Sequence, residues 1–79
     1  MDIKIYGSVG CFYCGQMKEL CKRADLEYES IEISSDKLSA LYPKATSYPY
    51  VIIDGEEIGG LVEAAKYFIK EGLVSARKD

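Results

Sequence analysis

Two of the chain's three cysteines, Cys11 and Cys14, lie three residues apart in the stretch "GCFYCGQM". Thiols at this spacing can close a disulfide across one helical turn, contribute ligands to a metal ion, or exchange with an external disulfide. Because the thiolate is the nucleophilic form of cysteine, the third possibility depends on whether something lowers the pKa of one thiol. The elements around the pair bear directly on that question.

The cysteine pair falls where a predicted strand passes into a predicted helix. Segment 1–6 alternates, with Ile3 and Ile5 on one face, and residues 7–10 interrupt the pattern. From residue 11 to about residue 24 the apolar side chains recur with helical spacing, which predicts an amphipathic helix. The predicted apolar stripe consists of Cys14, Met17, Leu20, Cys21 and Ala24.

This placement predicts different roles for the two cysteines. Unpaired backbone N–H groups and the helix macrodipole favour negative charge at a helix start, so the pKa of Cys11 is expected to be lowered. The effect fades within one turn, and Cys14 therefore gains less from it. We expect Cys11 to attack a substrate disulfide and Cys14 to resolve the mixed disulfide that results.

Structural interpretations of the cysteines compete with this one. A structural zinc site usually has four Cys or His ligands, whereas this chain has three cysteines and no histidine. A permanent disulfide between Cys11 and Cys14 would close too short a loop to stabilise the fold much. Two unrelated packed thiols are a further alternative, although that interpretation does not explain their position at a strand-to-helix junction. Cys21 lies on the apolar stripe and is expected to be a packed core thiol.

The remaining segments predict an α/β domain. Ile31 and Ile33 alternate with polar residues as in a strand with one exposed face, and the sequence Asp54-Gly55 between two strand-like runs predicts a tight hairpin. The first two strands should be parallel, joined by the helix between them. The predicted elements are strands 28–33, 50–53 and 56–58, a short helix within 34–43 capped by Ser34 or Ser35 and followed by Pro43, and a last helix bearing Leu61, Ala64, Ala65 and Phe68 that Gly72 closes.

Composition narrows the class of protein. The 79 residues are 48% hydrophobic and 29% charged, which predicts a single globular domain spanning residues 1–79. The net charge of −3 and the absence of a basic patch argue against nucleic acid as a partner. No apolar run approaches the roughly 20 residues that span a bilayer, and the start has no signal-peptide pattern. We therefore expect a cytoplasmic protein without membrane contact, in a compartment where thiols stay reduced.

Three features together resemble the glutaredoxin family. They are C-x-Y-C after the first strand, an X-Pro before the third strand, and Gly-Gly after the hairpin, in the stretches "IKIYGSVGCFYC" and "SYPYVIIDGEEIGG". The resemblance covers nearly the whole chain. It implies a thioredoxin-like fold of order β-α-β-α-β-β-α, in which a four-stranded mixed sheet is flanked by three helices.

The resemblance also implies a glutathione site. In the family, the proline that matches Pro49 is cis and faces the cysteines, and the residue that matches Tyr48 offers its backbone to the cysteinyl part of glutathione. The γ-glutamyl carboxylate is received by the start of the last helix, which is physically reasonable because a helix N-terminus binds anions. The implied glutathione-binding residues are Tyr13, Tyr48, Pro49, Gly60, Leu61 and Val62. The resemblance implies no obligate metal.

The chain departs from the family pattern around this site. Many glutaredoxins have proline where this chain has Phe12, and lysine where it has Ser8. Lys18 is a candidate replacement for the missing lysine, although a solvated surface lysine is the simpler interpretation. At the last helix Val62 replaces an acidic residue and Glu63 keeps one. These replacements bear on the affinity for glutathione and not on the thiol chemistry.

The resemblance implies a monomeric, glutathione-dependent thiol–disulfide oxidoreductase. Its substrates would be protein disulfides and glutathione mixed disulfides, with ribonucleotide reductase as a candidate electron acceptor. Two alternatives stay open. One is a glutathione-dependent iron–sulfur cluster protein, which the family includes mostly where the motif proline is missing. The other is a thioredoxin-like reductant fed by thioredoxin reductase, against which the Gly-Gly helix start and the lack of tryptophan before the motif argue.

Overall fold

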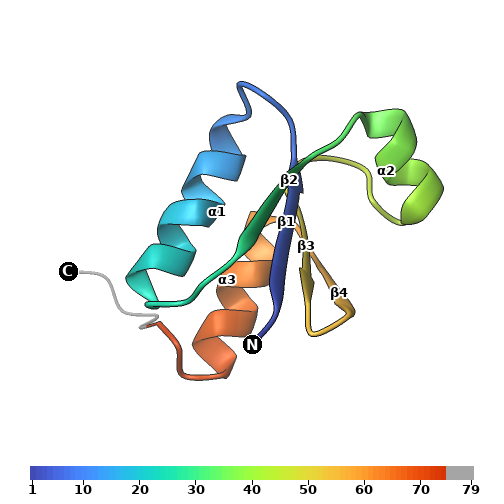
Figure 1. Cartoon of the computed structure of the whole chain (residues 1–79). Helices are drawn as coiled ribbons and strands as arrows, with labels where there is room; N and C mark the ends of the chain where they lie inside the picture. The colour runs from blue at the N-terminus through green and yellow to red at the C-terminus, as the bar shows by residue number, and fades with distance from the viewer. Residues whose placement is uncertain (75–79) are drawn as a thin grey trace.

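The computed structural model describes residues 1–74, which form one four-stranded sheet with helices on both faces (Figure 1). The predicted element order and the mixed four-stranded sheet with three helices are confirmed. In chain order the elements are β1 (Ile3–Gly7), α1 (Phe12–Arg23), β2 (Glu29–Glu32), α2 (Ser35–Leu41), β3 (Tyr50–Ile53), β4 (Glu56–Gly59) and α3 (Leu61–Lys70).

The strands lie in the order β2-β1-β3-β4, so the first strand is central. β1 and β2 are parallel, with Tyr6 opposite Ile31, as the intervening helix predicted. β1 and β3 are antiparallel, with Ile5 opposite Val51. Pairing with β3 begins at Ile3 and pairing with β2 ends at Gly7, so β1 is shifted relative to the predicted segment 1–6. β2 pairs only from Glu29 to Glu32 and is therefore shorter than the predicted segment 28–33.

The hairpin between β3 and β4 turns at Asp54 and Gly55, as predicted. Both residues have left-handed backbone conformations, with φ of 52° and 81°. A two-residue turn with positive φ at both positions matches the right-handed twist of the paired strands. This hairpin leads directly into α3, so its geometry determines where the start of α3 lies.

The sheet separates two hydrophobic cores. Figure 1 shows α1 and α3 on one side of the sheet and α2 on the other. On one face α1 and α3 pack against alternate residues of β1 and β3, and on the other face α2 and the loop after it cover the remaining ones. β3 is therefore buried on both faces. The first core contains Ile3, Ile5, Met17, Cys21, Val51, Ile53, Ala64 and Phe68. The second contains Tyr6, Leu38, Ala45, Tyr50 and Ile52.

α2 begins and α3 ends at the residues that local sequence signals predicted. Ser34 caps α2, with its Oγ accepting the Lys37 N–H at 3.3 Å. Gly72 follows α3 with a φ of 75°, a conformation that glycine adopts without steric cost. None of the helices within residues 1–74 is long and apolar enough to cross a bilayer.

Candidate active site

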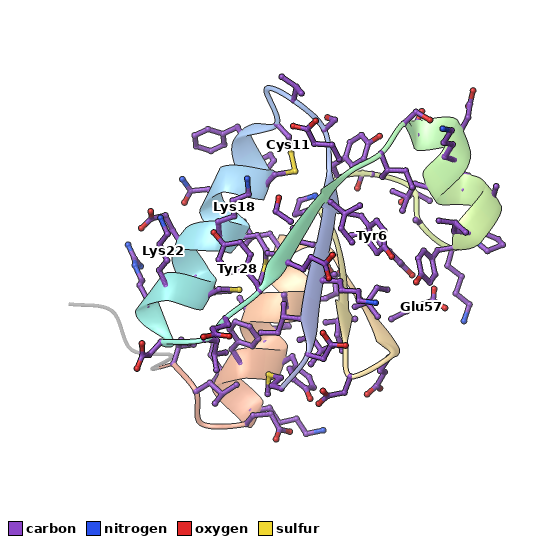
Figure 2. All side chains as sticks on the ribbon, viewed as in Figure 1. Tyr6, Cys11, Lys18, Lys22, Tyr28 and Glu57 are labelled. Atoms are coloured by element: carbon purple, nitrogen blue, oxygen red, sulfur yellow. A yellow bond between two sulfur atoms is a disulfide. The ribbon has the colours of Figure 1, made fainter. Side chains whose placement is uncertain are left out.

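Cys11 and Cys14 lie at the first turn of α1 and form a disulfide. Cys11 is the N-cap of the helix, with extended backbone, and Cys14 lies one turn further with its Cα 5.3 Å away. Figure 2 shows the labelled Cys11 at the start of the helix that carries the labelled Lys18 and Lys22. The predicted ability of the two thiols to bond across one turn is therefore confirmed.

The environment of Cys11 favours a negative charge on its sulfur. The Cys14 N–H donates a hydrogen bond to Cys11 Sγ over 3.1 Å, so a free backbone donor of the helix start points at this atom. The first turn of α1 carries no acidic residue, while Lys22 and Arg23 lie in its last turn. The backbone dipoles of α1 place Cys11 at the positive end of the helix, and no acidic side chain in the first turn offsets that field.

Cys14 occupies a different environment, because its side chain is only 5% exposed, whereas Cys11 is half-buried. Its sulfur lies against the backbone of Gly7, the last residue of β1. A Cβ built on Gly7 would stand 2.5 Å from Cys14 Sγ and 3.3 Å from Cys14 Cβ. The resolving sulfur can therefore occupy its position only because residue 7 has no side chain. The sequence analysis did not identify Gly7, because this contact joins the end of a strand to the first turn of a helix.

The peptide bond between Tyr48 and Pro49 is cis, as the family resemblance implied. Pro49 is fully buried, and the Tyr48 hydroxyl donates a hydrogen bond to the Ile33 carbonyl. That hydrogen bond ties the loop before β3 to the end of β2. The backbone of Tyr48 is thus held next to a cavity near the dithiol.

This cavity, of about 320 Å³, brings the proposed glutathione-binding residues together. Tyr13, which stands between the two cysteines in the chain, forms part of its wall. The lining residues are Tyr13, Ser47, Tyr48, Pro49, Gly60, Leu61, Val62 and Glu63. All six residues that the resemblance implied are in this set, and Ser47 is an addition that no local signal in the sequence pointed to.

The start of α3 forms the other wall of the cavity. Gly60 is the N-cap, and its N–H donates to Glu63 Oε1 over 3.0 Å, which is the one half of a capping box that a glycine without a side chain can make. Glu63 packs closely against both glycines, since a Cβ on Gly59 or Gly60 would come within 3.1 to 3.3 Å of its side chain. A second hollow of about 590 Å³ shares Ser47, Pro49, Gly60 and Glu63 but is otherwise lined by β3, β4 and the loop after α2. It does not include Tyr13, so of the two hollows the smaller one is lined by a residue of the C-x-x-C segment.

The third cysteine belongs to the core and not to the site. Cys21 is fully buried, and this burial raises the pKa of its thiol to about 11. The prediction of a packed thiol is confirmed.

Away from the dithiol, burial and then the 2.6 Å hydrogen bond to Glu57 raise the pKa of Tyr50 to about 12. Within residues 1–74, no three His, Cys, Asp or Glu side chains cluster closely enough to hold a metal ion.

Known glutaredoxins match this chain in sequence. The glutaredoxin family model matches residues 3–58. Glutaredoxin 1 of Escherichia coli is 30% identical over 84 aligned positions, which cover 92% of this chain and 98% of the relative. The match therefore extends over nearly the full length of both proteins.

Solved glutaredoxin structures match the fold. The structure of reduced E. coli glutaredoxin superposes with a TM-score of 0.70 at 27% identity, covering 92% of this chain and 98% of that one. Glutaredoxin 1 from Francisella tularensis, in complex with cacodylate, gives a TM-score of 0.74 at 25% identity, with 91% and 95% covered. A buckwheat glutaredoxin–glutathione complex gives 0.70 at 25% identity, covering 90% of this chain and 70% of that one. The thioredoxin-like fold is thereby confirmed.

Proposed function

This chain belongs to the glutaredoxin family and is a thiol–disulfide oxidoreductase; from that premise we propose that it reduces protein disulfides and glutathione mixed disulfides at the expense of glutathione. The observation that carries the proposal is the position of Cys11 Sγ. It sits at the N-terminus of α1, accepts the Cys14 N–H at 3.1 Å and lies within bonding reach of Cys14.

In the first step the Cys11 thiolate attacks one sulfur of the substrate disulfide. A bond forms between Cys11 Sγ and that sulfur, the substrate S–S bond breaks, and the departing sulfur leaves as a thiolate that takes a proton from solvent. Catalysis at this step comes from the helix start, which stabilises the thiolate before attack. Cys11 is the accessible member of the pair, as an attacking group must be, because it is half-buried while Cys14 is 5% exposed.

In the second step Cys14 resolves the mixed disulfide. Its sulfur loses its proton and attacks Cys11 Sγ, the second substrate sulfur leaves as a thiol, and the Cys11–Cys14 disulfide forms. Two electrons have then passed from the dithiol to the substrate. Two glutathione molecules return the enzyme to the dithiol, one forming a mixed disulfide with Cys11 and the other releasing it as oxidised glutathione.

The cavity beside Tyr13 supports glutathione as the reductant. It offers the backbone of Tyr48 to a cysteinyl unit and the start of α3, at Gly60, Leu61 and Val62, to a carboxylate. The buckwheat relative was solved as a glutathione complex. Glu63 uses one carboxylate oxygen for its cap, which leaves the other for the ammonium group of a γ-glutamyl unit.

The biological setting follows from the family. We expect a monomeric cytoplasmic enzyme that acts on disulfide-containing or glutathionylated proteins. Ribonucleotide reductase is a candidate acceptor, because its catalytic cycle requires dithiol reduction. Measuring turnover with ribonucleotide reductase in the presence of glutathione would test that assignment directly.

The central experiment measures NADPH oxidation with a glutathionylated peptide, glutathione and glutathione reductase. A parallel reaction contains the same peptide with thioredoxin reductase instead of glutathione and glutathione reductase. Turnover is expected only with glutathione. Cys11→Ser should abolish all turnover, whereas Cys14→Ser should abolish reduction of protein disulfides and keep reduction of the glutathionylated peptide, which needs a single thiol. Normal turnover of Cys11→Ser, or turnover driven only by thioredoxin reductase, would sink the proposal.

A further inference from the structure

We propose that the surface around the dithiol recognises a protein segment in which a large apolar residue flanks the reacting cysteine. This surface, the apolar rim, consists of Val9, Phe12, Tyr13 and Val62. The inference rests on the thiol–disulfide exchange proposed above but not on glutathione being the reductant. It defines the class of protein substrate that the same site accepts.

The first observation is the exposure of the rim. Val9 is 82% exposed, Phe12 70%, Tyr13 58% and Val62 61%. These four are more than half of the large apolar side chains that lie at the surface within residues 1–74, the others being Met1, Leu41 and Ile69. Apolar side chains gathered on one part of a surface typically mark an interaction site.

The second observation is the scarcity of charge. Residues 7–17 carry the dithiol, and residues 47–49 and 60–63 supply the rest of the cavity wall that Tyr13 lines. Residues 7–17 carry no charged side chain, and Glu63 is the single charged residue that lines the cavity, where its carboxylate accepts the Gly60 N–H. A charged residue beside the substrate cysteine would meet no opposite charge on the side chains of residues 7–17, whereas an apolar side chain loses nothing by contacting them. The charge pattern therefore favours an uncharged, apolar partner.

The third observation is that the rim adjoins the reacting sulfur. Phe12 follows Cys11 directly and stacks edge-to-face on Tyr13, with ring centroids 5.3 Å apart. Tyr13 and Val62 line the same cavity, so the rim extends from the start of α1 to the start of α3. A substrate cysteine bonded to Cys11 necessarily brings its neighbouring residues onto these side chains. Contact with an apolar neighbour would lower the energy of the mixed disulfide and of the transition state leading to it.

The test uses disulfide-linked peptide homodimers and no glutathione. The peptides share one sequence and differ only in whether leucine, serine, glutamate or lysine stands beside the cysteine. Stopped-flow measurement of a single turnover of the reduced enzyme gives the rate of each exchange. We expect the leucine peptide to react about fivefold faster than the serine peptide. The glutamate and lysine peptides should both be slower than the leucine peptide.

Phe12→Ser removes the largest exposed side chain of the rim and should bring the leucine-to-serine ratio close to one. Leu41→Ser is the matched control, because Leu41 is 61% exposed at the end of α2, away from the dithiol. It should keep the wild-type ratio. A wild-type ratio near one would overturn the proposal, as would an unchanged ratio in Phe12→Ser. So would a wild-type dimer that Phe12→Ser converts to a monomer, because the rim would then bind a second copy of the chain.

These outcomes are separable from those of the glutathione proposal. The peptide series contains no glutathione, so a lack of glutathione turnover leaves its result intact. Conversely, if the enzyme turns over with glutathione but does not discriminate among the peptides, the proposal of glutathione as reductant stands and only the proposal for the apolar rim is refuted. The serine peptide serves as the internal reference in every variant, which cancels any general effect on thiol reactivity.

Discussion

Gly7→Ala should make the dithiol more oxidising, because the added methyl group competes with Cys14 Sγ for space. The new Cβ would stand 2.5 Å from this sulfur, whereas ordinary contacts between nonbonded atoms are about 3.5 to 4.0 Å. The sulfur must therefore retreat by about 1 Å. Gly7 is not among the residues with positive φ, so alanine fits the backbone and the effect is confined to the contacts with Cys14.

The two redox forms do not share this cost equally. In the dithiol form Cys14 Sγ can rotate to another staggered position and relieve the 2.5 Å contact, while the 3.3 Å approach to Cys14 Cβ is common to both forms. In the disulfide form this sulfur is bonded to Cys11 and cannot rotate away. Overpacking typically costs about 1 to 3 kcal/mol, and if most of that falls on the disulfide form, the equilibrium with glutathione shifts by about tenfold for each 1.4 kcal/mol. For this two-electron couple a tenfold shift corresponds to about 30 mV.

The assay equilibrates the protein in glutathione redox buffers, quenches by alkylation and counts modified thiols by mass spectrometry. Gly15→Ala is the control, since it adds the same methyl group to the same motif where nothing lies within 4 Å. Its reduction potential should stay at the wild-type value, while its helix gains about 0.5 to 1 kcal/mol of stability. If Gly7→Ala folds and its potential is within about 10 mV of wild type, less than a threefold shift, the contact with Cys14 does not act as described.

The remaining predictions concern individual groups. Because burial raises the pKa of Cys21 to about 11, this thiol should resist iodoacetamide at pH 8 in the folded, reduced protein and react once denaturant is added. The same raised pKa means that the stabilising contribution of Cys21 is complete below the pKa it has in the unfolded chain, near 8.5, and is lost progressively as pH rises to about 11; comparing alkaline denaturation of Cys21→Ala with wild type checks this. In the reduced protein, thiolate absorbance at 240 nm should show the pKa of Cys11 below the ~8.5 of a free thiol, and a value at or above that figure would contradict the role given to the helix start. Glu63→Ala should lower the free energy of unfolding by about 1 kcal/mol by removing the acceptor of the Gly60 N–H, whereas Glu63→Gln should keep most of it; equal losses in chemical denaturation would argue against the cap.

Local patterns explain why much of the fold could be predicted. The turn at Asp54-Gly55 needs two left-handed residues in succession, and few residue pairs supply them. Ser34 begins α2 through a hydrogen bond to a residue only three positions away. The ends of β1 and β2 were less well predicted, because the extent of their pairing depends on a partner strand distant in the sequence.

The two cysteines could be assigned from the sequence because their chemistry is local. Spacing places Cys14 one turn from Cys11, and a helix start favours a thiolate whatever the rest of the fold is. The cavity residues Tyr48 and Gly60 could be named only through the family resemblance, since no spacing or composition rule brings them to Tyr13. The apolar rim was equally hidden, because an apolar side chain in the sequence is as consistent with burial as with exposure.

The amino-acid sequence by itself determined the type of chemistry, since the thiol pair and the helix that activates it lie within one continuous segment. Tertiary structure decided which substrates that chemistry acts on and what reduction potential the dithiol has. Packing α1 across the end of β1 brings Cys14 against Gly7, and the β3–β4 hairpin brings the start of α3 to the cis-proline loop. Both arrangements depend on segments far apart in the chain, whose approach is driven by burial of the two cores and is encoded in no short stretch of residues.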